Sequence, residues 1–420
     1  MKRNFTLKLF GTIAATALSL AAIVTPPASA ATVTLKVWSW QKPMTDDWNK
    51  IFAAYEAANP GVKVEFTGYV STDYPTVIKT GLTTADGPDI VMLHPYNSID
   101  QYVAAGQLSP ITATDVPTLS TVFSKDSLKA SEYGGKQYGV PFALQTVQMF
   151  YNKDIFKKVG VSVPKTASSF KALLPRIQKA GYTPISITGK TAWQLVNVFD
   201  GIVGPLYGGR EWVEGARAGT SLASNTEFKN ALTTFAGYSK YFPQFVTGVD
   251  YATSQSLFSS GKAAMYPGGA WELKGFQTAN SKLNMGVFSV PNGTDKTSPT
   301  WGYEDGSFGL SAKTKNRAES VKLLQWFSSK EFGQLFTNTL KQVSSVKGVK
   351  VSDPVLNQMI ENYQANPVPM YWITDCFGVS SPAPYAALMN GAQELLLKTK
   401  TVDQVAKSID TALGSCRKVS

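Results

Sequence analysis

The sequence predicts an α/β protein with two lobes, and three observations lead to this prediction. The chain has 420 residues, and the roughly 390 that follow an N-terminal address exceed what one hydrophobic core commonly supports. Its apolar content of 43% and aromatic content of 12% exclude a disordered chain. Segments with the two-residue period of strands alternate with segments of helical period, and this alternation is typical of α/β lobes.

The first thirty residues have the features of a secretory signal. Basic residues precede an apolar stretch from Leu9 to Val24, and the small-residue sequence Ala28-Ser29-Ala30 fits cleavage before Ala31. A membrane anchor is the alternative, but the stretch is shorter than the ~20 residues of a spanning helix. We therefore expect an exported protein, periplasmic or extracellular. Because neither cysteine lies near the cleavage site, we expect no N-terminal lipid anchor.

The charge of the chain bears on nucleic-acid binding, and its cysteines bear on disulfide formation. The net charge of +11 falls to +8 without the three basic residues of the signal, and the remaining Lys and Arg residues are scattered. This pattern argues against nucleic-acid binding. Cys376 and Cys416 are the only cysteines, and an oxidising compartment favours a disulfide between them. Two buried free thiols are the alternative, because the sequence does not reveal their separation.

The order of elements in the first part of the mature chain places two polar segments at one edge of a sheet. Val33, Leu35 and Val37 alternate with polar residues and predict a strand, which ends at Trp38-Ser39-Trp40. The continuously apolar run Ile90–Leu93 predicts a strand covered on both faces, and His94-Pro95-Tyr96 follows it. Because ligands bind beyond the carboxyl ends of parallel strands, both segments are expected at the rim of one cleft.

The inventory of reactive side chains argues against an enzyme. His94 is the single histidine, and the sequence has neither a nucleophile elbow nor the ligand supply of a zinc site. Pro267-Gly268-Gly269 lacks the residues of a phosphate-binding loop and is interpreted as a turn. Glu304 and Asp305 are neighbours, so they are poor candidates for the facing carboxylates of a glycosidase. A pair from separate segments stays open, and no cofactor is expected.

Tryptophans next to polar or small residues indicate a carbohydrate site. A sugar ring presents a face of C–H bonds that packs on an indole, whereas its hydroxyls need hydrogen-bonding side chains at the edge. For any single tryptophan, the alternative to sugar stacking is that the ring simply packs in the hydrophobic core. The tryptophans with such neighbours are Trp38, Trp40, Trp193, Trp271, Trp301 and Trp372.

Two neighbouring segments, Tyr138-Gly-Val-Pro141 and Phe150-Tyr-Asn-Lys-Asp-Ile-Phe156, are the strongest of several local matches to one protein family. These segments resemble the family 1 extracellular solute-binding proteins of ABC importers, the maltose-binding-protein-like carbohydrate receptors. Their order and spacing across the mature chain are more specific than any one of them. The further matching segments are Phe52–Val64, Gly87–Val91, Val163–Thr166, Gly181–Ile185, Phe258–Met265, Gly269–Trp271 and Thr401–Val405.

This resemblance implies a two-lobed, periplasmic-binding-protein-like fold with discontinuous lobes joined by a hinge. After a signal peptide at 1–30, lobe one would comprise 31–142 plus 271–311, and lobe two 143–270 plus 312–420. The implied function is to bind a mono- or oligosaccharide by hinge closure and deliver it to a membrane-embedded ABC permease. We expect a monomer. The alternatives are a secreted carbohydrate-active enzyme and a binding protein for a non-sugar solute.

Ligand-binding residues are expected from both lobes. Asp89 could instead cap the backbone of its Gly-Pro-Asp turn, and Glu304 with Asp305 could form an exposed loop. From lobe one we choose Trp40, Gln41, Asp89, Glu304 and Asp305; from lobe two Gln145, Trp193, Asn197, Trp372 and Asp375; and at the hinge Trp271.

Overall fold

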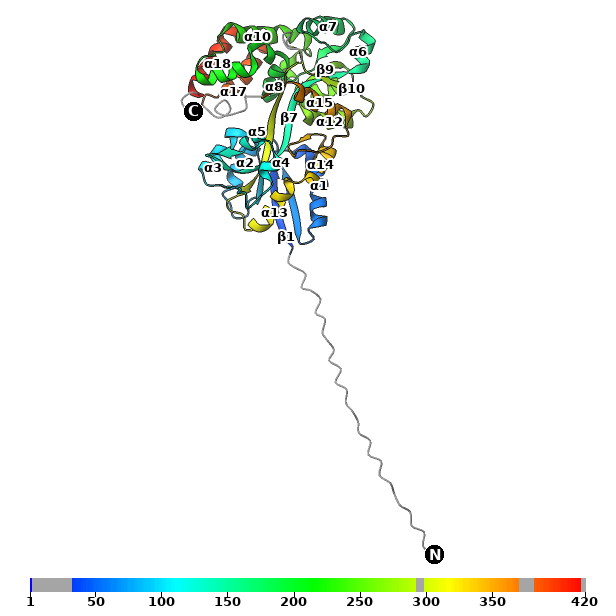
Figure 1. The fold of residues 1–420 in the computed structure, drawn as a ribbon. Coiled ribbons are helices and arrows are strands. Elements are labelled where there is room, and N and C mark those ends of the chain that lie inside the picture. The colour runs from blue at the N-terminus through cyan, green and yellow to red at the C-terminus, as the bar shows by residue number, and fades with distance from the viewer. Residues whose placement is uncertain (2–31, 292–297, 370–380, 417–420) are drawn as a thin grey trace.

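The computed structural model describes residue 1 and residues 32–291, 298–369 and 381–416. It has two lobes, one stacked on the other, with the long strand β7 running from one to the other (Figure 1). Both lobes contain helices and strands, as the alternating sequence pattern predicts. None of the helices in these described ranges combines the length and the hydropathy of a membrane span.

The first lobe is built on parallel strands. β1 pairs in parallel with β2 on one side and with β3 on the other, and all four residues of β3 are buried, as its apolar run predicts. Helices cover the sheet. The elements are β1 (Val33–Ser39), α1 (Thr45–Ala58), β2 (Val62–Gly68), α2 (Tyr74–Gly81), β3 (Ile90–Leu93), α3 (Asp100–Ala104), β4 (Leu108–Ser109), α4 (Leu119–Val122), α5 (Lys125–Lys129), β5 (Glu132–Tyr133) and β6 (Lys136–Gln137).

The second lobe surrounds a smaller group of strands with more helices. β8 pairs in parallel with β9, and β9 and β10 pair antiparallel with β7. Its elements are α6 (Lys153–Val159), α7 (Ala167–Lys179), β8 (Thr183–Ile185), α8 (Ala192–Val203), α9 (Gly209–Ala218), α10 (Thr226–Gly237), α11 (Tyr251–Ser259), β9 (Ala263–Gly268), α12 (Leu273–Ala279), β10 (Met285–Phe288), α15 (Pro354–Ala365), β13 (Pro367–Pro369), α17 (Pro384–Leu397) and α18 (Val402–Cys416).

Two long antiparallel strands, β7 (Gly139–Asn152) and β11 (Thr300–Ser311), join the lobes. They pair from Gly309↔Gly139 to Trp301↔Val147, with an irregularity around Gly306. We refer to this pair as the ribbon. At one end Phe142 and Phe308 belong to the core of the first lobe, and at the other Val147 and Trp301 belong to the core of the second. The ribbon therefore completes both hydrophobic cores.

The packing corrects the expected division of the chain between the lobes. The segment 312–342, expected in lobe two, forms α13 (Arg317–Phe327) and α14 (Lys330–Leu340) in the core of the first lobe. There Phe332 lies 6.3 Å from Trp48, between ring centroids. Residues 271–291, expected in lobe one, pack in the second lobe, where Phe276 contacts Phe258.

This error has a physical cause. A third crossing, at β12 (Val343–Ser344), returns the chain from α14 to the second lobe and pairs with β7. The strand is only two residues long, so its sequence carries no recognisable period. A direct contact also ties the lobes together beside α12: the Lys274 Nζ donates to the Thr339 carbonyl at 2.7 Å and pairs with Asp47 of α1.

We predict that Gly306→Ala destabilises the protein by roughly 1 to 3 kcal/mol because the site is already filled. A Cβ at this position would lie 2.7 Å from both the Leu93 carbonyl oxygen and the Trp40 ring. Gly275→Ala in α12 is the matched control, since its Cβ would meet nothing within 4 Å and alanine favours the helix. Urea unfolding of both variants checks this. Equal stabilities would contradict the tight packing of the ribbon.

Candidate functional site

The ribbon has two faces that carry different side chains between the lobes. Residues opposite each other in the ladder share a face, and successive residues alternate. The pairs Leu144↔Glu304 and Thr146↔Gly302 therefore form one face, and the pair Gln145↔Tyr303 forms the other. Asp305 lies on the second face, because the Gln145 Nε2 donates to its Oδ2 at 3.3 Å.

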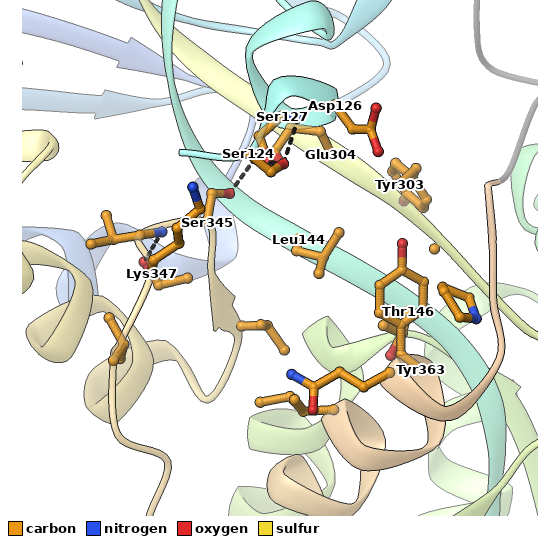
Figure 2. Close-up of a pocket in the computed structure, with 18 of the residues that line it drawn as sticks. Ser124, Asp126, Ser127, Leu144, Thr146, Tyr303, Glu304, Ser345, Lys347 and Tyr363 are labelled. Carbon is orange, nitrogen blue, oxygen red and sulfur yellow. Dashed lines mark hydrogen bonds between the residues drawn. The ribbon is translucent and has the colours of Figure 1, made fainter. Parts of the chain in front are cut away.

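A cavity of about 830 Å³ lies along the ribbon and is lined by residues of both lobes (Figure 2). This volume is in the range of small-molecule sites. The first lobe contributes Ser124, Asp126, Ser127 and Lys129 around α5, and the second contributes Glu214, Arg217, Tyr363 and Gln364. The ribbon and the third crossing complete the wall with Leu144, Thr146, Tyr303, Glu304, Ser344 and Ser345. Most of these side chains carry a hydroxyl, a carboxyl, an amide or a basic group.

Glu304 is a buried carboxyl in the wall of this cavity. Its Oε1 accepts a hydrogen bond from the Ser345 hydroxyl of the third crossing, and its Oε2 has no partner among the described residues. Burial raises the pKa of Glu304 to about 8, against the lowering effect of the hydrogen bond from Ser345. At neutral pH a protonated Glu304 can donate one hydrogen bond as well as accept others.

Three tyrosine rings lie around the cavity. Tyr96 follows β3 with a left-handed φ of 60°. Burial, followed by the charge of Asp305 and by Tyr385 and Tyr96, holds the pKa of Tyr303 well above its ordinary value. Tyr363 of α15 packs on Gly302, where any Cβ would overlap its ring. The rings thus come from the first lobe, the ribbon and the second lobe.

On the other face of the ribbon, Gln145 links a carboxyl to the third crossing. Its Nε2 donates to the Gln342 Oε1 at 2.8 Å and to Asp305, while its Oε1 is buried without a described partner. Burial raises the pKa of Asp305 to about 6, and the bond from Gln145 opposes this rise. Of the predicted site residues, Gln145, Glu304 and Asp305 are therefore brought together at the ribbon.

Two predicted tryptophans and Asn197 lie in the second lobe. Trp193, at the start of α8, is 37% exposed and makes an edge contact with Tyr251 at 5.5 Å between ring centroids. Trp271 is partly buried, and its Nε1 donates to the Glu272 Oε1 at 3.0 Å. Asn197 is buried on α8. None of these three residues is in the cavity wall described above.

Trp40 and Gln41 make packing and hydrogen-bond contacts inside the first lobe. Trp40 is 9% exposed and stacks on His94 with 4.0 Å between ring centroids. Gln41 is buried, and its Oε1 accepts from the Trp48 Nε1 at 2.7 Å. Both residues pack within the first lobe, and Trp40 also approaches the ribbon at Gly306.

Asp89 is not brought to the other predicted residues. It precedes β3, at the end of that strand opposite Tyr96. Its carboxylate accepts from the Lys36 backbone N–H at 2.9 Å, from the Thr314 hydroxyl at 2.5 Å and from the Asn316 amide at 3.3 Å. These hydrogen bonds join β1 and the segment 314–316 to the start of β3, and the ligand role of Asp89 stays a prediction.

Three other predictions fall outside the described side chains. Trp372, Asp375 and Cys376 lie in residues 370–380, and Cys416 is the last residue of α18. Their roles stay predictions. Tyr303, Tyr363 and Ser345 line the cavity but were not predicted from the sequence. Of the cavity tyrosines, only Tyr96 was expected near a cleft, because it follows a predicted buried strand. Within the described chain, no three His, Cys, Asp or Glu side chains gather closely enough to hold a metal.

Comparison with known proteins decides the family. The family model described as bacterial extracellular solute-binding protein matches residues 50–366. This chain belongs to that family. The multiple sugar-binding protein of Streptococcus mutans serotype c is 25% identical over 356 residues, which cover 81% of this chain and 83% of that protein. The maltotriose-binding protein of Pyrococcus abyssi is 25% identical over 66% of this chain and 58% of its own length.

Solved structures share the fold of this solute-binding protein. A chitin oligosaccharide binding protein superposes with a TM-score of 0.79 at 22% identity, covering 92% of this chain and 99% of that one. The solute-binding protein RafE in complex with raffinose has a TM-score of 0.77 at 22% identity, covering 92% and 100%. The two-lobed solute-binding fold predicted from the sequence is confirmed.

The raised pKa of Glu304 predicts a pH-dependent stability. A folded-state pKa of about 8, above the ordinary 4.5, favours the protonated native state. This stabilisation is complete below pH 4.5 and is lost as the pH rises towards 8. Relative to Glu304→Gln, the wild-type free energy of unfolding should fall by about 1.4 kcal/mol per pH unit inside this window. Urea unfolding between pH 5 and 8 measures the difference, and parallel curves for both proteins would contradict the assignment.

Proposed function

We propose that this solute-binding protein binds a carbohydrate between its two lobes and delivers it to a membrane-embedded ABC permease. The observation that carries the proposal is the cavity of about 830 Å³ with polar walls from both lobes. Its hydroxyls, carboxyls and tyrosine rings match a ligand that has many hydroxyls and an apolar ring face.

The polar walls have the hydrogen-bonding capacity that a sugar needs. Ser124, Ser127 and Thr146 can each donate and accept, and Asp126 can accept from two hydroxyls. A protonated Glu304 would donate to a ring or hydroxyl oxygen. Each of these contacts selects for a particular hydroxyl, because a buried polar group that finds no partner costs about 1 to 3 kcal/mol.

The predicted residues outside the cavity wall extend the proposed site. Gln145 and Asp305 would bind sugar hydroxyls on the other face of the ribbon, and Asn197 of α8 would contribute from the second lobe. Trp193 and Trp271 would supply stacking surface, and the 37% exposure of Trp193 leaves area for a ligand. Trp40, Gln41, Trp372 and Asp375 stay proposed as ligand-binding residues.

The relatives favour a sugar over other solutes. The names of the two relatives above refer to multiple sugars and to maltotriose, and at 25% identity they support the ligand class rather than one sugar. A hydrolase with Glu304 and Asp305 as its catalytic pair is disfavoured, because the two carboxyls lie on opposite faces of β11. We propose that the ligand is released unchanged.

We predict that one carbohydrate in a panel of mono- and oligosaccharides raises the melting temperature of the purified mature protein saturably. A ligand at ~100 times its dissociation constant adds about 2.7 kcal/mol to the native state. Mass spectrometry of the recovered ligand should show an unchanged sugar. A shift with amino acids or polyamines, and none across the sugars, would overturn the carbohydrate assignment.

Substitution of Trp193 by alanine tests the stacking surface. The variant should lose roughly ten- to hundred-fold in sugar affinity, by analogy with the ~1 to 3 kcal/mol of base–aromatic stacks. Its unfolding free energy should stay close to wild type, because the ring is partly exposed. Trp326→Ala is the matched control, since Trp326 packs on Tyr55 in the first lobe and should change stability without changing affinity. A large loss of unfolding free energy with unchanged sugar affinity in Trp193→Ala would instead identify Trp193 as a packing residue.

Export supports the proposed delivery to a permease. The chain expressed with its first thirty residues should be recovered outside the cytoplasm with Ala31 as its N-terminal residue, because Ala28-Ser29-Ala30 fits signal cleavage. N-terminal sequencing by mass spectrometry measures this. Recovery of the intact chain in the cytoplasm would contradict the proposed localisation.

A further inference from the structure

A buried carboxylate that the proposed function does not use lies directly behind Trp271. Glu272 is fully buried in the second lobe. Its Oε1 accepts hydrogen bonds from the Tyr251 hydroxyl at 2.7 Å, the Trp271 Nε1 at 3.0 Å and the Tyr266 hydroxyl at 3.1 Å, and its Oε2 accepts from the Gln255 amide at 2.6 Å. Four neutral donors thus converge on one carboxylate.

We propose that Glu272 is the positioning residue of the tryptophan surface: its carboxylate holds Trp271 directly and Trp193 through Tyr251. This inference rests on the proposed function, since it assigns the stacking geometry of that site. The direct contact is the hydrogen bond from the Trp271 indole to Glu272, which restricts rotation of the ring about its side-chain bonds. An indole bonded to a charged acceptor is held more firmly than one bonded to a neutral group.

Glu272 is connected to Trp193 indirectly, through two sets of contacts. The Tyr251 hydroxyl is bonded to Glu272, and the edge of its ring contacts Trp193. The Tyr266 hydroxyl donates to Glu272 and accepts from the Gln194 amide at 2.6 Å. Gln194 is the residue next to Trp193 at the start of α8. One carboxylate therefore constrains the segments that carry both tryptophans.

The glycine pair Gly268-Gly269 explains how this arrangement fits at the end of β9. A Cβ on Gly268 would lie 2.9 Å from the Glu272 Cγ, and a Cβ on Gly269 would overlap the Trp271 ring. The interpretation of Pro267-Gly268-Gly269 as a turn is wrong, because Pro267 and Gly268 belong to β9. The two missing side chains leave space for the carboxylate and the indole. Burial raises the pKa of Glu272, although the four hydrogen bonds offset part of this rise.

Glu272→Gln tests the inference with a nearly isosteric neutral group. We expect the Trp271 indole ¹H–¹⁵N signal, assigned with Trp271→Phe, to move away from its wild-type position. We also expect the affinity for the carbohydrate identified in the panel to fall about tenfold, since bonds to charged groups are the stronger ones. Tyr251→Phe should leave the Trp271 signal in place, shift that of Trp193, and weaken affinity several-fold.

Gln255→Ala is the matched control. It removes a hydrogen bond of the same carboxylate, but from Oε2, whereas Trp271 and Tyr251 bond to Oε1. Both indole signals and the affinity should stay near wild type even if stability falls. The inference would be overturned if Gln255→Ala and Glu272→Gln lost the same amount of stability and the same amount of affinity. Glu272 would then only stabilise the fold.

A second variant keeps the test decisive if Glu272→Gln does not fold. Gly269→Ala should displace the Trp271 ring through the overlap described above, and it should weaken binding with Glu272 still present. Wild-type affinity for both Gly269→Ala and Tyr251→Phe would overturn the inference. The indole signals are measured without ligand, so they test the positioning by Glu272 on their own. A wild-type protein that binds no sugar would refute the proposed function but would not affect this measurement.

Discussion

The antiparallel ladder between β7 and β11 is the constraint on which the rest of the structure depends. Its hydrogen bonds run from the first lobe into the second without interruption except around Gly306. Apolar residues occupy both ends, where Phe142 and Phe308 complete one core and Val147 and Trp301 complete the other. Because each lobe needs its half of the ladder, neither lobe can move far without bending these two strands.

The middle of the ladder carries polar side chains, and this departure from the apolar pattern has an energetic cost. Glu304 and Asp305 are enclosed carboxyls whose pKa values burial raises to about 8 and about 6. The Gln145 Oε1 and the Glu304 Oε2 are buried without partners in the described chain. Such groups lower stability by leaving hydrogen bonds unmade. A ligand that supplies the missing partners would recover part of that free energy when it binds.

The sequence predicted the fold more completely than the site. The period-two segment Val33–Val37 located β1, because side-chain burial alternates along that strand. The apolar run Ile90–Leu93 located β3, because all four of its residues are buried. The lobe boundaries were wrong after residue 270, since β12 has only two residues and gives no pattern. Tyr303, Tyr363 and Ser345 were missed because tertiary packing alone brings their separate segments to one cavity. The bonds of Asp89 to Lys36, Thr314 and Asn316 could not be predicted, because a buried, hydrogen-bonded aspartate and a ligand-binding one have the same local sequence.

Three parts of the molecule contribute separately to the proposed function. The ribbon sets the relation of the lobes, the cavity offers hydrogen bonds, and Glu272 orders the tryptophans of the second lobe. A closing motion about the ribbon would bring the first-lobe residues around α5 onto a ligand held by the second lobe. The contact of Lys274 with Asp47 and Thr339 links the lobes directly.

Small-angle scattering with and without saturating carbohydrate tests the central claim, that the two lobes close about the ribbon on a bound sugar. The sugar identified by the thermal panel should lower the radius of gyration of the wild-type protein. The same titration with a sugar that gave no thermal shift should leave the radius unchanged. An unchanged radius of gyration with the bound sugar would contradict closure and leave a rigid, preformed cavity.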